Sequence, residues 1–194
     1  MFNGIIKNTG QIDFILSKKN NCFIKIKSNL KFRRGEIGSS VSCSGVCLTL
    51  EDFKKNMIKF YLSKETISKS NFKYLKKGDF INIEKSLKYG NRISGHMIQG
   101  HVDTTCKITD IKHVGKSWYI NFKLKSKHKK YIVEKGSIGI NGVSLTISKI
   151  FKNSFQIVVI PKTLELTNLI YLKKNDFVNV EFDILGKYIK NFVK

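Results

Sequence analysis

The sequence predicts an all-β protein built from two tandem copies of one small domain. Two observations predict this class. Long stretches of the chain match each other at an offset of about 97 residues. Within each copy, short stretches rich in β-branched and aromatic residues alternate with Gly and Asn turns. Short strands at close spacing favour a small closed barrel or a sandwich, and barrel closure removes exposed strand edges.

The duplication is visible as four blocks that match in the same order in both halves. The pairs are GSSVSCSGVCLTL over KGSIGINGVSLTI, ETISKSNF over KTLELTNL, YLKKGDFINIE over YLKKNDFVNVE, and MFNGIIKNTGQIDFI over MIQGHVDTTCKITDI, the last with one residue of slip. Four ordered blocks at one offset exclude chance similarity. They predict two homologous domains, residues 1–96 and 97–185, joined without a flexible linker.

The strand signals are clearest in four segments, which are residues 57–62, 80–85, 117–125 and 155–160. A short helix is expected in SKHKKYIVEKG, with Ser126 as its N-cap and Gly136 beyond its end. The equivalent stretch of the first half, SNLKFRRGEIG, ends in the same way. The prediction is therefore of β domains that carry only short helices.

The tail has no counterpart in the first half. Its apolar residues recur at helical spacing, namely Ile184, Leu185, Tyr188, Ile189, Phe192 and Val193. They predict a C-terminal oligomerisation helix over residues 186–194, with a start near residue 184 also compatible. Two interpretations stay open: the apolar stripe packs on its own barrel, or it forms a seam between subunits.

Composition bounds the class of protein. Hydrophobic residues make up 41% of 194 residues, with one proline and 14 glycines, which is typical of a folded protein. The net charge of +22 suggests a polyanion as partner. However, the lysines are spread along the chain and Arg33, Arg34 and Arg92 are the only arginines. This pattern favours a solvated surface over a specific nucleic-acid interface, with salt-sensitive nonspecific adhesion expected.

Cysteine usage and the chain start indicate a cytoplasmic protein. The four cysteines fit no C-x2-C spacing for a metal or a redox pair, and MFNGIIKNTG lacks the pattern of a signal peptide. No apolar run approaches the ~20 residues that cross a bilayer. We therefore expect no metal site and no membrane partner.

Seven motifs together resemble the riboflavin synthase family, whose chains contain two lumazine-binding repeats. They are MFNGII, SGVCLTL, KETI, SGHMIQGHVDTT, GINGVSLTI, IPKTLELTNL and NDFVNVEFD, and they span nearly the whole chain. The resemblance implies two six-stranded β-barrels, a C-terminal helix that organises a homotrimer, no cofactor, and an association with lumazine synthase. It also implies a dismutation, in which one 6,7-dimethyl-8-ribityllumazine gives a four-carbon unit to another. The products are riboflavin and 5-amino-6-(D-ribitylamino)uracil.

A duplicated domain suits a reaction between two identical molecules, because it supplies two pockets for one heterocycle. One molecule must donate and the other accept, so the two pockets must also differ. The second half has His101, Lys135 and Ser144 at pocket positions where the first half has Ile5, Gly38 and Cys47. We expect these divergent positions to create the asymmetry. Retained positions, which are Gly4 with Gly100, Thr49 with Thr146 and Thr66 with Thr163, are expected to serve binding.

The resemblance also implies which residues contact the two lumazines. These substrate-binding candidates are Gly4, Ile5, Ile6, Cys47, Leu48, Thr49, Lys64, Glu65, Thr66, Gly100, His101, Val102, Lys135, Ser144, Leu145, Thr146, Ile160, Pro161, Lys162, Thr163, Leu164 and Glu165.

Four of these residues are also catalytic candidates, namely Cys47, His101, Ser144 and Thr146. Histidine is the side chain best suited to exchange protons at working pH, and the reaction removes a proton from the C7 methyl of one lumazine, so His101 is the candidate for this transfer. Ser144 can orient a water or bond the anionic heterocycle, and Thr146 can join the same proton network. The alternatives are a structural histidine and hydroxyls that satisfy backbone groups of a strand.

Other candidates have open alternatives. Cys47 is either a nucleophile or a small buried contact residue. Phe2 lines the space where the rings meet, by stacking or by holding the amino-terminal segment in place. Asp183 orients the histidine or a hydroxyl, or is a solvated acid. Lys135 holds a ribityl hydroxyl or a developing anion, or is an ordinary lysine after a helix.

Some positions depart from the family pattern. Asn3 replaces a customary threonine, Cys43 and Ser44 replace a common Val-Asn pair, and Asn141 stands where an aspartate can occur. Two rival functions remain in view: a noncatalytic lumazine or flavin carrier, and a nucleic-acid binder. Retention of His101, Ser144 and Thr146 argues against the carrier.

Overall fold

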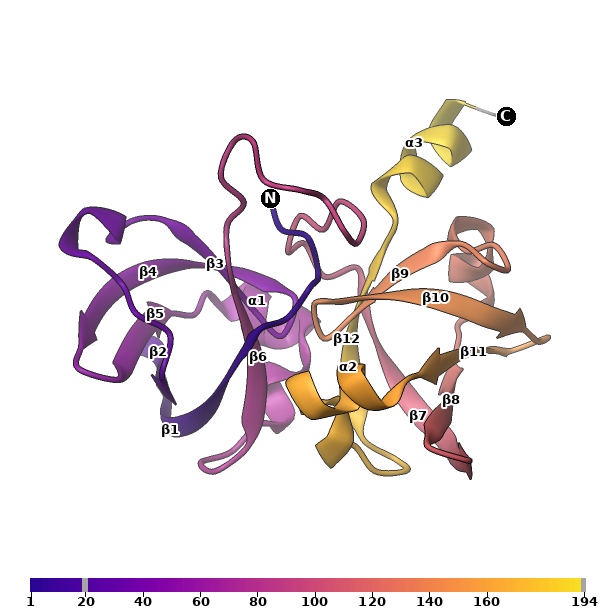
Figure 1. Ribbon diagram of the computed structural model, residues 1–194, viewed down its shortest axis with the longest axis horizontal. Helices are drawn as coiled ribbons and strands as arrows, with labels where there is room; N and C mark the ends of the chain where they lie inside the picture. The colour runs from indigo at the N-terminus through magenta and orange to yellow at the C-terminus, as the bar shows by residue number, and fades with distance from the viewer. Residues whose placement is uncertain (19–20, 193–194) are drawn as a thin grey trace.

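The computed structural model describes residues 1–18 and 21–192, and the duplication appears in it as two barrels side by side (Figure 1). The strands of the first barrel are β1 (Asn8–Lys18), β2 (Asn21–Ser28), β3 (Ser40–Cys43), β4 (Val46–Lys54), β5 (Met57–Tyr61) and β6 (Phe80–Lys85). Those of the second are β7 (Thr104–Val114), β8 (Ser117–Lys123), β9 (Ser137–Ile140), β10 (Val143–Ile150), β11 (Ser154–Val159) and β12 (Phe177–Phe182). The four strand segments expected from the sequence correspond to β5, β6, β8 and β11.

Both barrels are closed, antiparallel and six-stranded over the described residues. The strand order is β1-β2-β5-β4-β3-β6 in the first barrel, and the second closes in the equivalent order. Even the irregularities repeat. β1 changes register between Ile12 and Phe14, and β7 does so at the equivalent place, between Ile108 and Asp110. Such bulges bend a strand, so the same device curves both sheets into barrels.

Each barrel has its own apolar core, because alternate side chains of each strand point inward. In the first barrel Ile24 and Ile26 on β2 face Ile58 and Phe60 on β5, and all four are buried. The second core repeats this arrangement; for example, Phe122 of β8 stacks on Phe155 of β11. The cores are separate, so the contact between the barrels must come from other residues.

Buried asparagines join the two barrels. Nδ2 of Asn82 on β6 donates to the carbonyl oxygen of Asn141, at 2.9 Å. Nδ2 of the equivalent Asn179 on β12 donates to the carbonyl oxygen of Ser44, also at 2.9 Å. Oδ1 of Asn179 in addition accepts from the backbone N–H of Asn71, at 2.6 Å. A buried amide needs such partners, so this network fixes the barrels in one relative orientation.

Two tight turns meet at the centre of this interface. The β3–β4 and β9–β10 hairpins turn at Ser44-Gly45 and Asn141-Gly142, and all four residues have positive φ, as hairpin turns of this kind require. A Cβ on Gly45 would lie 2.7 Å from the backbone nitrogen of Gly142. Glycine at these positions therefore allows the turns to touch.

The helices are short and differ partly from expectation. Two helices that the sequence did not predict are α1 (Lys64–Lys69) and α2 (Pro161–Leu166), each followed by a 3-10 turn, η2 (Asn71–Tyr74) or η4 (Asn168–Tyr171). The expected helix in residues 126–136 is only the 3-10 helix η3 (Ser126–Tyr131). Its N-cap is Lys125, so the prediction of Ser126 as cap is wrong; Ser126 is the first helical residue. The equivalent stretch forms just η1 (Arg34–Glu36).

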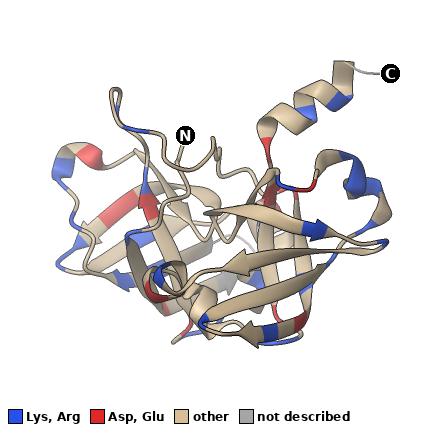
Figure 2. Cartoon of the chain, turned by 45° about the vertical axis from the view of Figure 1, so that its right-hand side comes forward, with Lys and Arg blue, Asp and Glu red and all other residues tan. Residues whose placement is uncertain are grey.

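The C-terminal helix α3 (Ile184–Phe192) projects away from the second barrel (Figure 1). Val193 and Lys194, part of the predicted helix, lie outside the described residues. Lys and Arg residues are distributed over both barrels and α3 (Figure 2). Among the described helices, none has the length and apolar character needed to cross a membrane.

Candidate active site

The site begins with the two segments that open the repeats, residues 1–7 and 97–103, which we call the first and second opening segments. They pair with each other between the barrels through an antiparallel bridge of Phe2 and Ile98. The Phe2 N–H donates to the Ile98 carbonyl oxygen at 2.7 Å, and the Ile98 N–H returns a 3.1 Å bond. Both side chains are fully buried. Burial and pairing of Phe2 fix the amino-terminal segment between the barrels.

Beyond the bridge, each opening segment crosses to the barrel of the other repeat. The backbone N–H of Ser144 on β10 donates to the carbonyl oxygen of Gly4, at 2.9 Å. The N–H of the equivalent Cys47 on β4 donates to the carbonyl oxygen of Gly100, at 2.8 Å. Ile6 accordingly belongs to the second core. Each site therefore combines a strand of one repeat with the opening segment of the other.

This crossing changes the grouping of candidates expected from the sequence, which placed His101, Lys135 and Ser144 together in the pocket of the second repeat. His101 does not share a site with Ser144 and Lys135 of its own repeat, because its segment lies against Cys47 of the first barrel. Val102 packs against the first core in the same way. An alignment of the repeats shows which residues are equivalent, but it does not show which residues touch between the two barrels.

Glycine is required at both crossing points. Gly4 and Gly100 have φ of +71° and +81°, in the left-handed region. A Cβ on Gly4 would lie 2.6 Å from the backbone nitrogen of Ser144, and one on Gly100 would lie 2.6 Å from Cβ of Cys47. The retained glycines thus allow close approach of the backbones.

Two equivalent glutamates hold the opening segments in place. Glu84 on β6 accepts from the N–H groups of Asn3 and Gly4, at 2.8 and 3.0 Å. Glu181 on β12 accepts from those of Gln99, Gly100 and His101, at 2.7, 2.9 and 3.0 Å. Burial raises the pKa of both carboxyls, and the N–H donors partly oppose it. The sequence showed this glutamate pair inside the repeated blocks, but gave no reason to single it out.

At the first barrel, the exposed edge of the site carries His101 and Thr49, with half-buried Cys47 beside Gly100. Leu48 points into the first core. Ile5, by contrast, is 38% exposed on the first opening segment, which lies against the second barrel. His101 is thus an exposed residue that directly follows Gly100, whose backbone contacts Cys47, and its exposure leaves it open to a ligand.

The helix α1 contributes the other first-repeat candidates. Lys64 and Glu65 are exposed in its first turn, and Glu65 pairs with Lys69 at 2.7 Å. Thr66 is hydrogen-bonded to the N-cap residue Ser63. Its N–H donates to Ser63 Oγ at 3.0 Å, and the hydroxyls of the two residues lie 2.8 Å apart. These contacts stay within α1 and its cap, so they do not tie α1 to the opening segments.

At the second barrel, Ser144 is half-buried and Thr146 exposed, while Leu145 packs against the second core. Oγ of Ser144 lies 2.7 Å from Nδ1 of His96, in the loop before the second opening segment. Burial lowers the pKa of His96, and the charge of Asp183 partly opposes this. His96 was missed as a site residue because it has no counterpart in the first repeat; the only signal was its place in the motif SGHMIQGH.

The helix α2 borders the same barrel. Ile160 is its N-cap residue and Pro161 its first residue, a position that proline favours. Leu164 is buried in the second core, and Lys162 pairs with Glu165 at 2.8 Å on the exposed side. Thr163 is half-buried. The candidates at residues 160–165 therefore lie on a helix, or at its cap, that is anchored in the second core by Leu164.

Lys135 has an unusual backbone. It is exposed, with φ of +67°, and its first-repeat equivalent is Gly38 at +88°. A non-glycine residue in this region costs of order 1 kcal/mol and is enriched at functional sites. The left-handed backbone recurs at this position in both repeats, and the contacts of the described residues show no partner for the Lys135 Nζ.

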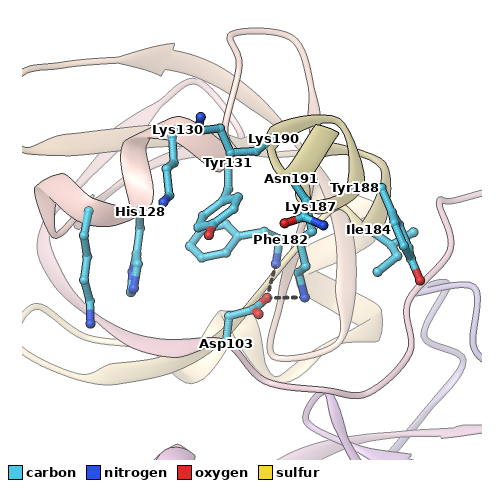
Figure 3. Close-up of a pocket in the computed structure, with 11 residues that line it drawn as sticks. Asp103, His128, Lys130, Tyr131, Phe182, Ile184, Lys187, Tyr188, Lys190 and Asn191 are labelled. Atoms are coloured by element: carbon cyan, nitrogen blue, oxygen red, sulfur yellow. Dashed lines mark hydrogen bonds and ion pairs between the residues drawn. The ribbon is translucent and has the colours of Figure 1, made fainter. Parts of the chain in front are cut away.

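Asp183 acts mainly on the C-terminal helix. Its Oδ1 accepts from the N–H of Leu185 at 3.0 Å, and its carbonyl oxygen accepts from the N–H of Lys187. Asp103 holds the same region, because its Oδ2 accepts from the Phe182 N–H at 2.8 Å and pairs with Lys187 at 2.7 Å. Asp103, Phe182 and Lys187 border an open hollow of about 710 Å³ between η3 and α3, which Asp183 does not line (Figure 3). Gly4 and Gly100, where the opening segments cross, are not among the residues that line it.

Comparison with known proteins decides the family. A model of the lumazine binding domain matches residues 3–86 and again 99–183. Riboflavin synthase of Buchnera aphidicola subsp. Schizaphis graminum is 37% identical over all of this chain and 94% of its own length. Those of Photobacterium phosphoreum and Bacillus subtilis are each 34% identical over all of this chain and 89% or 90% of their own. The chain belongs to the riboflavin synthase family.

Solved structures agree with this family. LumP complexed with riboflavin superimposes with a TM-score of 0.82 at 25% identity, over 94% of this chain and 99% of LumP. LumP complexed with 6,7-dimethyl-8-(1'-D-ribityl) lumazine gives a TM-score of 0.81 at 23% identity over the same shares. The fold expected for the riboflavin synthase family, two six-stranded barrels and a C-terminal helix, is confirmed.

Proposed function

We propose that this chain converts two molecules of 6,7-dimethyl-8-ribityllumazine into riboflavin and 5-amino-6-(D-ribitylamino)uracil. The observation that carries the proposal is the pair of equivalent but chemically unequal sites. At the first, Cys47 lies against Gly100, which His101 follows in the chain. At the second, Ser144 lies against Gly4, which Ile5 follows. Transfer of a four-carbon unit needs one donor and one acceptor of the same heterocycle, which such a pair supplies.

Binding both substrates contributes much of the rate. Two reactants held in a reactive orientation can gain ~7 to 11 kcal/mol relative to free encounter. The glutamate-held opening segments and the asparagine network support this role, because they fix the backbone at both sites. The polar groups then have only proton transfers and charge stabilisation to perform.

We assign the chemistry to few residues. His101 is the proton-transferring candidate at the first site, with Cys47 as a contact residue. Ser144 and Thr146 are the hydroxyls at the second, and Lys135 supplies a positive charge near them. Phe2 holds the opening segment, and Asp183 acts through α3 and the charge it places near His96. The other substrate-binding candidates keep the roles implied by the family resemblance.

A turnover assay tests this function. Purified protein is mixed with 6,7-dimethyl-8-ribityllumazine, and riboflavin is followed by absorbance and fluorescence. The expected result is one riboflavin for every two lumazines consumed. Lumazine binding without riboflavin formation would instead support a noncatalytic carrier, the second candidate, which the structural similarity to ligand-bound LumP favours.

Assembly and location extend the proposal. A homotrimer organised by α3 is supported by the exposed apolar residues of that helix, which are Leu185, Tyr188, Ile189 and Phe192. A cytoplasmic location is supported by the spacing of the cysteines, which fits no metal or redox pair. The division of the chain into residues 1–96, 97–185 and 186–194 is supported by the two barrels and α3, and association with lumazine synthase rests on the family resemblance alone.

A further inference from the structure

We infer that His96 is a positioning residue for the reaction, acting through the hydroxyl of Ser144. The inference rests on the proposed binding of one lumazine beside Ser144. Nδ1 of His96 lies 2.7 Å from Oγ of Ser144, a short and well-formed contact. A serine hydroxyl rotates freely unless a partner holds it. His96 therefore selects the direction in which Ser144 presents its hydroxyl to a ligand.

The loop that carries His96 is built to hold it there. The Gly95 N–H donates to Oδ1 of Asn3 at 2.7 Å, and Nδ2 of Asn3 donates to the carbonyl oxygen of Arg92 at 3.2 Å. Asn3 is buried and its own N–H is held by Glu84. A Cβ on Gly95 would lie 2.1 Å from the Asn3 carbonyl oxygen. Asn3, which departs from the family's usual threonine, thus fastens both ends of the turn before His96.

The surroundings of the imidazole favour its neutral form. Burial lowers the pKa of His96, and the charge of Asp183, which follows β12, opposes this in part. Two further charged residues stand on the segments tied to its loop, Glu84 behind Asn3 and Arg92 in the loop itself. Nε2 is buried and finds no partner among the described residues. A bare acceptor is tolerated there more readily than an orphaned N–H. This favours the tautomer in which Nδ1–H donates to Ser144, leaving the serine O–H to donate to the ligand.

Four variants test the role. His96→Ala removes the contact, and His96→Asn places an amide close to the former Nδ1 position without a titrating group. Ser144→Ala removes the other partner, and the double variant closes a cycle. His113→Ala is the control, because that histidine stacks on Trp118 at the far end of β7. Turnover, lumazine affinity by fluorescence titration, and thermal unfolding are measured for each.

His96→Ala should lower kcat about tenfold or more with lumazine affinity nearly unchanged, since a hydrogen bond that orients a reacting group is lost. His96→Asn should recover most of the loss, and the double variant should be no slower than Ser144→Ala. Unchanged kcat in His96→Ala, failure of His96→Asn to recover it, or additive losses would overturn the inference. Absence of turnover by the unsubstituted protein would contradict the proposed function instead.

Discussion

The backbone N–H of Cys47 donates a 2.8 Å hydrogen bond to the carbonyl oxygen of Gly100, although the two residues belong to different repeats. The equivalent bond joins Ser144 to Gly4. Each site is therefore completed by the other repeat. A change in one opening segment should consequently affect the barrel of the other repeat, which makes the crossing accessible to experiment.

Replacement of Gly100 by alanine tests this crossing. A Cβ there would lie 2.8 Å from the Cys47 nitrogen, and φ is +81°. We expect Gly100→Ala to weaken lumazine binding by at least about fivefold, because misfit at such a contact costs about 1–3 kcal/mol. Gly78→Ala is the matched control, since its φ of +96° is similarly strained while its Cβ would meet open space. Equal effects of the two variants on affinity would contradict the crossing.

His101→Ala tests the proton-transfer assignment. We expect kcat to fall about 10²-fold or more, as for loss of a general acid or base, while lumazine affinity is largely kept. Single-turnover kinetics and fluorescence titration measure the two quantities separately. His113→Ala should leave both unchanged, because His113 is exposed on the second barrel. A normal rate in His101→Ala would remove this residue from its proposed role.

The asparagine network between the barrels should matter for stability. Asn179→Ala leaves the Asn71 N–H and the Ser44 carbonyl oxygen buried without their partner. We expect the free energy of unfolding to fall by about 2–4 kcal/mol, measured by urea denaturation. Asn153→Ala, at an exposed turn, is the control and should change it by less than about 0.5 kcal/mol. A loss no larger than in this control would argue against the network.

The pKa of Glu181 predicts a pH effect on stability. Burial raises this pKa above 4.5, so the folded state holds more protons than the unfolded state between 4.5 and the folded value. The contribution of Glu181 is therefore fully present below pH 4.5 and is lost as pH rises through the folded pKa. The unfolding free energy of the unsubstituted protein minus that of Glu181→Gln should therefore decrease as pH rises from 4.5 through the folded pKa of Glu181. A difference that rises or stays constant with pH would disagree with a raised pKa.

Assembly through α3 is testable by light scattering after size exclusion. Ile189 is 62% exposed on α3, and Ile189→Glu should convert the proposed trimer to monomers, since a buried unpaired charge opposes association. Val133→Glu is the control, because Val133 is similarly exposed, at 67%, but lies off the helix. A trimer that persists in Ile189→Glu would exclude this face of α3 as the seam.

The duplication and the strand signals predicted two similar β domains, and the family resemblance supplied the six-stranded barrel. Alternating apolar residues such as those of β6 and β8 predict strands, and the matched blocks predict that both halves fold alike. The helices α1 and α2 were not predicted, because six residues give too little periodicity to distinguish a helix from a loop. The predicted cap of η3, Ser126, is one residue too late, because so short a helix has no periodic pattern that marks its first residue.

The arrangement of the site was harder to predict than its members. Self-comparison pairs Cys47 with Ser144, but the contacts of the fold join Cys47 to Gly100 and Ser144 to Gly4. Only the docking of the barrels decides this. His96 has no counterpart in the first repeat, so the alignment of the two repeats, which revealed the other site residues, could not reveal it. Its contact with Ser144 depends on a loop conformation that Asn3 and Gly95 create.

A crystal structure of the protein soaked with a nonreactive lumazine analogue would show whether each site is formed by both repeats. We expect a ligand at each barrel, one beside Cys47 and His101 and one beside Ser144 and Ile5, each touching both repeats. Ligand in neither barrel, or ligands that each contact one repeat alone, would contradict this expectation.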